Sequence, residues 1–260
     1  MRARKLKIAV LLSVAGVALV AVALQPPIPQ PASYHDFADR RGLLGIPNFW
    51  NVASNLPFLL LGGLGLVAVW RGPAPGVLPP LRPAYLCFFI GATLVAAGSS
   101  YYHWSPDHAS LVGDRLPMAI AFMAFFAIML GEQLDPRLGR GALWPLLLIG
   151  AASVVYWHYS EKAGRGDLRP YVIVQFVPML LVPLLLLLFR SRLTRTRLVW
   201  GVLAAYALAK LLEAFDRSLF ETTGLISGHS LKHLVAAAGV YFMLRAVRVR
   251  QVALDGPASR

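Results

Sequence analysis

Residues Leu116–Leu134, LPMAIAFMAFFAIMLGEQL, decide the fold class. The run is continuously apolar from Met118 to Leu130, without the alternation of apolar and polar positions that a transmembrane β-strand shows. A hydrocarbon core about 30 Å thick is crossed by about 20 apolar residues in a helix, which rises about 1.5 Å per residue. The stretch therefore predicts a membrane-spanning helix.

Seven further stretches of the same character are spread along the chain. They are Ile8–Leu24, Phe49–Trp70, Ala84–His103, Leu143–Tyr159, Tyr171–Phe189, Leu198–Phe215 and His229–Val247. Backbone amides in lipid must be paired internally, which a helix achieves alone. We therefore predict an all-α polytopic membrane helix bundle, with a seven-span core and one extra N-terminal hydrophobic helix.

The composition also indicates a membrane protein. The 260 residues are 57% hydrophobic and 14% charged, whereas soluble domains carry about 25% charged residues. The net charge of +13 suggests nucleic acid, but the basic residues fall in short loops, where they set membrane orientation instead. We therefore exclude a nucleic-acid partner. The single cysteine, Cys87, excludes a disulfide framework and a cysteine metal site.

Basic residues are concentrated on one side of the predicted bundle. They occur at both termini and in the loops after the second, fourth and sixth stretches, whereas the other loops are mixed in sign. The positive-inside rule then makes both termini cytoplasmic. Because the Arg-, Ala- and Leu-rich composition indicates a bacterium, we expect the bacterial inner membrane, with the remaining loops in the periplasm.

The N-terminal stretch allows two interpretations. Residues 1–28 combine a basic start, an apolar run and Ala21-Val22-Ala23, which resembles a signal-peptidase site. The apolar run is longer than a usual signal core, so we favour a retained anchor over a cleaved signal peptide. Residues 29–250 are predicted to form the seven-transmembrane-helix domain, and residues 251–260 a cytoplasmic tail.

Polar residues gather at the periplasmic ends of three predicted helices, although ionisable side chains cost about 2.5–3.5 kcal/mol each at mid-membrane. Ser99 and His103 share a helix face, and Asp114 lies at the start of the next span. His229 and His233 begin the last span, four residues apart. The three histidines can supply three nitrogens to one metal ion, with headgroup or packing contacts as the plain alternative.

Three nitrogen ligands leave the fourth tetrahedral position of zinc open, as in catalytic rather than structural sites. Zinc lowers the pKa of bound water to about 7 and so provides hydroxide at neutral pH. Asp114 can orient that water or act as a general base. Ser99 can hydrogen-bond a ligand, the water or a developing oxyanion.

Four segments resemble the alkaline ceramidase family, part of a superfamily of seven-span membrane hydrolases that also includes adiponectin-receptor-like proteins. They are NFWNVASN (Asn48–Asn55), GSSYYH (Gly98–His103), DRLPM (Asp114–Met118) and GHSLKH (Gly228–His233). The resemblance extends from about Asp36 to Val247. It implies a zinc amidase that cleaves ceramide to a fatty acid and a sphingoid base, with zinc on the three histidines and Ser99 and Asp114 as the catalytic pair.

Eukaryotic members of that family also hold calcium before their first span. The matching residues here are Asp36, Asp39 and Asn48, so the resemblance implies a calcium site. The segment departs from the family pattern, because it is less acidic and has Asn48 where a carboxylate is expected, whereas calcium takes six to eight oxygen ligands. The alternative is that Asp36 and Asp39 pair with Arg40 or Arg41.

Two further groups of polar residues have supporting interpretations. Asn51, Ser54 and Asn55 recur at helical spacing and are predicted to hold helices together. Glu213 and Asp216 either support a histidine or form ion pairs with nearby lysine and arginine side chains.

The leading hypothesis is a zinc-dependent amide hydrolase whose substrate, ceramide or another N-acyl lipid, arrives laterally from the membrane. The main alternative is a lipid-binding, receptor-like or regulatory membrane protein with a structural metal site. A transporter is disfavoured, because the ionisable groups lie at one face and not near mid-membrane.

Overall fold

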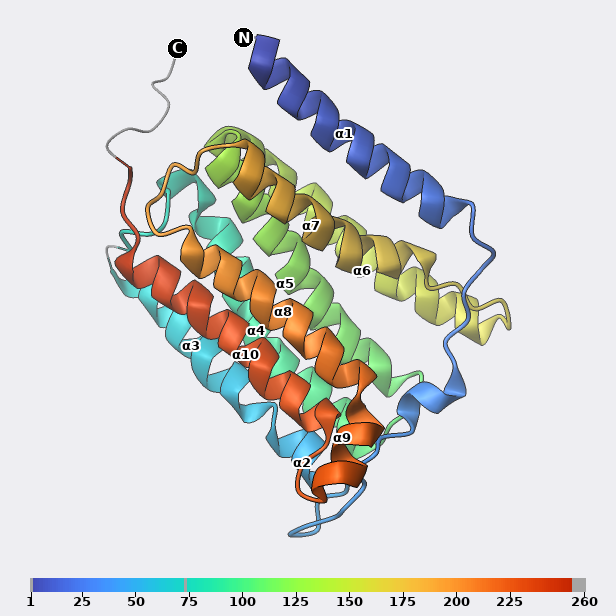
Figure 1. The fold of residues 1–260 in the computed structure, drawn as a ribbon. Coiled ribbons are helices and arrows are strands. Elements are labelled where there is room, and N and C mark those ends of the chain that lie inside the picture. The colour runs from blue at the N-terminus through green and yellow to red at the C-terminus, as the bar shows by residue number, and fades with distance from the viewer. Residues whose placement is uncertain (1, 73, 254–260) are drawn as a thin grey trace.

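The computed structural model describes residues 2–72 and 74–253, which form a helical bundle (Figure 1). Its long helices are α1 Arg2–Ala23, α3 Leu56–Arg71, α4 Arg82–Trp104, α5 Ser110–Gln133, α6 Pro136–Lys162, α7 Arg169–Leu188, α8 Arg197–Ala214 and α10 Gly228–Val249. The short helices are α2 Phe49–Ala53 and α9 Asp216–Thr223, with 3-10 turns at Ala32–His35 and Pro79–Leu81. The all-α prediction is confirmed.

All eight predicted stretches are helical, and the chain is a multi-pass membrane protein. Within residues 2–72 and 74–253, seven helices, with α2 and α3 taken together, are long and apolar enough to cross a membrane, and α8 with α9 makes an eighth if that bent pair is one span. The second predicted helix is interrupted at Ser54 and Asn55, where α2 ends and α3 begins. The axis turns by 71° between α8 and α9, so α9 lies across one end of the bundle.

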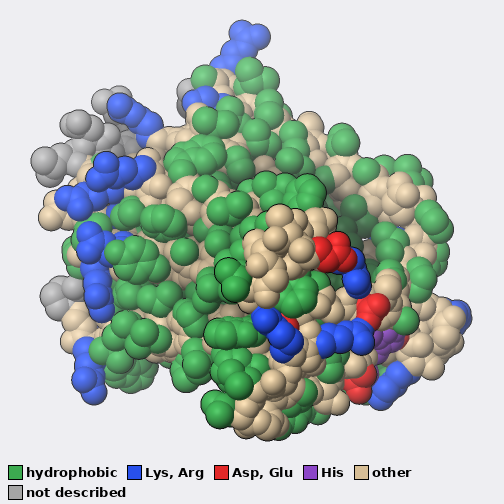
Figure 2. All heavy atoms as spheres, turned by 60° about the horizontal axis from the view of Figure 1, so that its bottom comes forward, with side chains coloured by type: hydrophobic (Ala, Val, Ile, Leu, Met, Phe, Trp, Pro, Cys, Tyr) green, Lys and Arg blue, Asp and Glu red, His purple; other side chains and the backbone are tan. Residues whose placement is uncertain are grey.

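The two ends of the bundle differ in chemistry. At the histidine end, α4 ends with Trp104 and α10 begins with Gly228; at the basic end, α3 ends with Arg71 and α10 ends with Val249. Figure 2 shows hydrophobic side chains over much of the visible surface, Lys and Arg without acidic residues at its left, and Asp, Glu and His mixed with further Lys and Arg at its lower right. This is the asymmetry expected of a membrane protein with one basic side.

Helices α4 and α5 lie at the centre of the bundle and pack closely against each other. A Cβ atom on Gly98 of α4 would lie only 1.9 Å from the carbonyl oxygen of Gly113 of α5. Small residues at this crossing therefore let the two backbones approach, as is common between membrane helices. By contrast, α1 packs mainly on α7, and Leu11 is its one buried residue among those described (Figure 1).

A buried ion pair closes the basic end. Arg250 donates to Glu132 over 2.7 Å, both side chains are fully buried, and the Tyr85 hydroxyl donates to the same carboxylate. The backbone of Gln251 accepts a hydrogen bond from Thr194. The start of the predicted tail, residues 251–253, therefore lies against the bundle, while residues 254–260 of that prediction fall outside the described residues.

Candidate metal centre

Three histidines from two helices meet at the histidine end. His103 comes from the last turn of α4, and His229 and His233 come from the first two turns of α10. All three are buried, and one ring nitrogen from each lies within 4.8 Å of the others. Spacing by four residues places His229 and His233 on one face of α10, and the packing of the bundle brings that face to α4.

The geometry fits a tetrahedral metal ion. His103 Nε2 and His229 Nε2 are 3.3 Å apart. Two nitrogens bound tetrahedrally to zinc at about 2.0–2.1 Å lie about 3.3–3.4 Å from each other. The Nδ1 atom of His233 is engaged by the Ser54 hydroxyl at 2.8 Å, which leaves its Nε2 for a metal. The donor set, three imidazole nitrogens, suits zinc.

Ser54 is a supporting residue whose role the sequence did not identify. Its spacing predicted contacts between helices, and it makes one, but the partner is the ring of His233. A hydrogen bond to the second ring nitrogen fixes the orientation of a metal-binding histidine. The break between α2 and α3 occurs at this residue, and the Ser54 hydroxyl also lies 3.2 Å from the carbonyl of Asn51.

The chain segment before α2 covers the histidines. The ring of Phe37 is buried, with its centroid 4.7 Å from those of both His103 and His229. The N–H of Ala38 donates to Asp216, and the carbonyl of Asp39 accepts from Asn51. Sequence reasoning missed Phe37, because nothing in its local pattern indicates which loop folds over the site.

The same segment gives the calcium prediction no support. The Asp36 carboxylate pairs with Arg40, and both carboxylate oxygens of Asp39 accept hydrogen bonds from the Arg41 side chain. The Asn48 side chain donates its N–H to the carbonyl of His103, with its backbone in the left-handed region. The arginine pairing foreseen as the alternative is what the structure has, with both aspartates paired to arginines.

The two acidic residues near α9 have different partners. Glu213 pairs with both Lys210 and Lys232, so it forms ion pairs and does not contact a histidine ring. Asp216 accepts a hydrogen bond of 2.7 Å from the backbone N–H of His229. Asp216 therefore supports the histidines through the first turn of α10, whose N–H groups have no partner within the helix.

Ser99 and Asp114 lie beside the triad. Ser99 is one turn before His103 on α4, and Asp114 lies in the first turns of α5. Both side chains are buried, and the Ser99 side chain lies next to the Asp114 carboxylate. Both line a cavity of about 350 Å³ that His233 also lines. A serine, a carboxylate and one of the three histidines therefore share one cavity.

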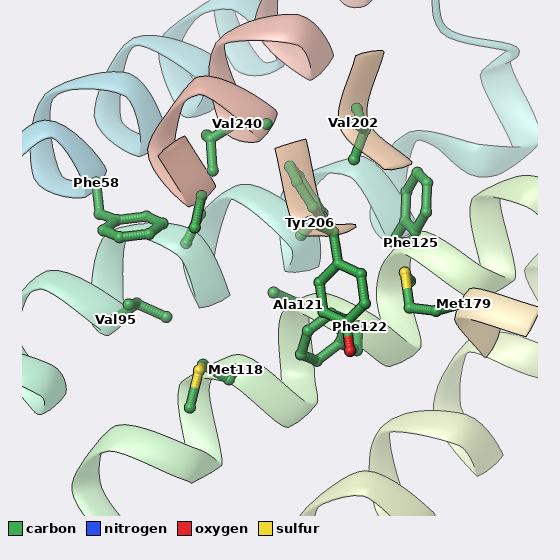
Figure 3. A pocket seen from close by; sticks show the side chains of 14 residues that line it. Phe58, Val95, Met118, Ala121, Phe122, Phe125, Met179, Val202, Tyr206 and Val240 are labelled. Carbon is green, nitrogen blue, oxygen red and sulfur yellow. The ribbon is translucent and has the colours of Figure 1, made fainter. Parts of the chain in front are cut away.

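A second cavity, of about 130 Å³, continues from the first toward the basic end and is almost wholly apolar. Side chains from α3, α4, α5, α7, α8 and α10 converge on it, as Figure 3 shows for Phe58, Val95, Met118, Phe125 and Val240. The two cavities share lining residues. Together they place an apolar chamber directly beneath the polar groups.

Two other histidines form a separate pair. His35 lies 2.9 Å from the Tyr102 hydroxyl through Nδ1 and 2.6 Å from His108 Nδ1 through Nε2. Burial lowers the pKa of His35, and the neighbouring His108 lowers it further. His158 stands apart beside Trp157 and Tyr159, as an interfacial residue would.

These features define a polytopic membrane protein with a buried three-histidine centre and an apolar chamber next to it. The model of the ceramidase family matches residues 45–260, and the chain belongs to this family of amide-hydrolysing membrane enzymes. The match begins after Asp36 and Asp39, the two carboxylates of the calcium prediction. A search of curated proteins found no match.

Proposed function

We propose that the protein is a zinc-dependent amidase that hydrolyses the N-acyl bond of a membrane lipid, ceramide or a related N-acyl lipid. The observation that carries the proposal is the triad of buried imidazoles beside Ser99 and Asp114, in a chain of the ceramidase family. His103, His229 and His233 hold the metal. When bound, zinc acts as a Lewis acid and lowers the pKa of a coordinated water to about 7.

Asp114 is the proton carrier in this proposal. Its carboxylate takes a proton from the attacking water and passes it to the departing amine nitrogen, so water and the amide become a carboxylic acid and an amine. Ser99 lines the same cavity and donates a hydrogen bond from its hydroxyl to the carbonyl oxygen as negative charge develops there, and this stabilisation is strong in a buried site.

The two cavities indicate where each end of the lipid binds. The acyl chain occupies the apolar chamber beneath the site, and the amine portion remains near the polar groups at the histidine end. Helices α7 and α8 make few contacts with each other, yet Phe176 of α7 and Lys210 of α8 both line the larger cavity. A lipid therefore reaches the site laterally between these two helices.

The membrane arrangement is part of the same proposal. Both termini are cytoplasmic, the histidine end faces the periplasm of a bacterium, and residues 29–250 form the hydrolase domain behind an N-terminal anchor. The basic residues at the end opposite the histidines support this orientation.

The test is zinc content together with turnover on detergent-purified protein. Wild type is expected to carry about one zinc per chain and to release fatty acid from an N-acyl lipid, whereas His229→Ala/His233→Ala retains neither. Asp114→Asn is expected to keep its zinc and lose at least about 100-fold in turnover. His158→Ala, a histidine outside the triad, is the control and should change neither quantity.

The receptor-like alternative gives a different result. Full zinc occupancy with no hydrolysis of any N-acyl lipid, or equal turnover in wild type and Asp114→Asn, would contradict the enzymatic proposal. Absence of zinc from folded wild type would contradict the metal centre itself.

A further inference from the structure

Arg115 is a buried cation that the proposed reaction does not use. It directly follows Asp114 on α5, its side chain is 5% exposed, and it lines the larger cavity. No carboxylate among the described residues forms an ion pair with it. An arginine keeps its charge in a protein, and a buried charge without a partner is costly.

Three aromatic rings hold the guanidinium in place. Its central carbon lies 4.1 Å from the ring centre of Trp157, 4.9 Å from that of Tyr171 and 5.6 Å from that of Tyr34. One nitrogen, Nη2, donates to the side-chain carbonyl of Gln30. The other, Nη1, is buried and has no hydrogen-bond partner among the described residues. The group is therefore rigid, yet one of its donors remains unused.

The charges of the cavity favour one negative ligand. Besides His233 and three tyrosines, the ionisable residues that line it are three cations, Arg115, Lys210 and Lys232, and two carboxylates, Asp114 and Glu213. Glu213 is occupied by both lysines, so it does not compensate Arg115. With both carboxylates ionised, these five side chains carry one positive charge in excess, and a zinc ion on the histidines would add to it, so the cavity favours an anionic ligand.

Arg115 lies at the depth in the cavity where the polar part of a bound lipid would be. Arg115 is level with Asp114, while the apolar chamber begins at Met118, one turn further along α5 toward the basic end. Its neighbours Gln30 and Tyr34 belong to the segment that leads to Phe37 over the histidines. A planar guanidinium binds a carboxylate through paired hydrogen bonds, which no neutral headgroup can match.

We propose that Arg115 binds a lipid carboxylate within the site. This inference rests on the proposed amidase function and narrows its substrate. The carboxylate belongs either to the amine portion of the substrate, which is then an N-acyl amino acid lipid, or to the released fatty acid. The hydrolysis reaction is unchanged by this role: water adds across the amide bond, and Arg115 takes no part in proton transfer.

The experiment compares two amides with the same acyl chain, N-palmitoylglycine and N-palmitoylethanolamine, in detergent micelles with zinc-loaded protein. If the carboxylate is that of the substrate, wild type is expected to favour the glycine amide in kcat/KM by at least about tenfold, and Arg115→Gln should lose that preference, mainly through a higher KM for the glycine amide. If it is that of the released fatty acid, neither protein should distinguish the two amides, because both release palmitate. Arg169→Gln is the matched control, because Arg169 is already paired with Asp167 and does not line this cavity.

A binding measurement separates the two sources of the carboxylate. In the Asp114→Asn background, melting temperature is recorded with N-palmitoylglycine, N-palmitoylethanolamine, palmitate or hexadecanol. Stabilisation by N-palmitoylglycine that Arg115→Gln removes assigns the substrate carboxylate. Stabilisation by palmitate alone, also dependent on Arg115, assigns the product. If no carboxylate stabilises the protein more than its neutral counterpart, the proposal is wrong.

Two further outcomes distinguish a failure of this inference from a failure of the proposed function. If no amide is hydrolysed although zinc is bound, the amidase proposal fails and the melting measurement still tests Arg115. If Arg115→Gln does not fold, Arg115→Lys takes its place, because it keeps the charge and loses the paired hydrogen bonds. Lower stability of Arg115→Lys, with an unchanged preference between the two amides and unchanged stabilisation by palmitate, would show a structural cation and overturn the proposal.

Discussion

The hydrogen bond between Ser54 and His233 illustrates how one residue prepares the metal centre. The Ser54 hydroxyl meets His233 Nδ1 at 2.8 Å, so the opposite nitrogen faces His103 and His229. Such outer contacts typically change metal affinity by about 10–100-fold when they are lost. Ser54 lies between α2 and α3, whereas His233 lies on α10. The hydrogen bond therefore couples the orientation of the His233 ring to the packing of α2 and α3 against α10.

We therefore expect Ser54→Ala to weaken zinc binding by about tenfold or more, measured by competition with a chelator on purified protein. Ser153→Ala is the control, since that buried hydroxyl bonds only to the carbonyl of Gly150 within α6. The control should lose no zinc affinity. Equal affinities for Ser54→Ala and wild type would show that packing alone orients His233.

The first turn of α10 is held from outside the helix. Asp216 accepts hydrogen bonds from the N–H of His229 at 2.7 Å and from that of Ala38 at 3.0 Å, so it joins the covering segment to the helix that carries two ligands. Asp135 has the comparable local role at the start of α6, where it accepts from the N–H of Arg137 at 2.7 Å.

These two aspartates give a matched pair of variants. Asp216→Ala and Asp135→Ala should each destabilise the protein by about 1 kcal/mol, measured as a lower melting temperature in detergent. Only Asp216→Ala should also weaken zinc binding, because only its helix end presents ligands. If both variants bind zinc as wild type does, the position of His229 does not depend on this cap.

Helices α4 and α5 meet where two glycines touch. Gly98→Ala would place a methyl group 1.9 Å from the Gly113 carbonyl oxygen, so the helices must separate next to Ser99 and Asp114. We expect a loss of about 1–3 kcal/mol in stability and about 100-fold in turnover, because small displacements of catalytic groups cost that much.

The control for this substitution is Gly63→Ala on α3, where a new methyl group would meet no atom within 4 Å. Its stability and turnover should match those of wild type. Zinc content should remain near one per chain in Gly63→Ala, and in Gly98→Ala it measures whether the separation also displaces His103, which lies on α4 five residues after Gly98. Full turnover in Gly98→Ala would show that the α4–α5 crossing adapts without disturbing the site.

At the scale of the whole molecule, charge and site lie at opposite ends. The basic residues cluster where the first helix begins and α10 ends, whereas the three histidines lie at the other end. A reporter enzyme that is active only in the periplasm should therefore be active when fused after Ala163, in the α6–α7 loop, and inactive when fused after Val249. The reverse pattern would place the metal centre on the cytoplasmic side.

Much of this architecture was predictable from the sequence, because a membrane imposes simple local rules. Length and apolar character alone identify a spanning helix, so all eight stretches were located, with errors at their ends and at the break near Ser54. Spacing by four residues likewise identified His229 and His233 as neighbours. The distribution of basic residues among the loops predicted the orientation of the chain in the membrane.

Contacts between distant segments were decided by the tertiary structure. Whether Phe37 lies over the triad, and whether Arg115 meets a carboxylate or three aromatic rings, depend on how loops and helices far apart in the chain are brought together. A local sequence pattern shows the helical period, but it does not show which residues contact the helix in the folded protein. The sequence by itself therefore determined the helices and the ligand types, and packing determined what surrounds them.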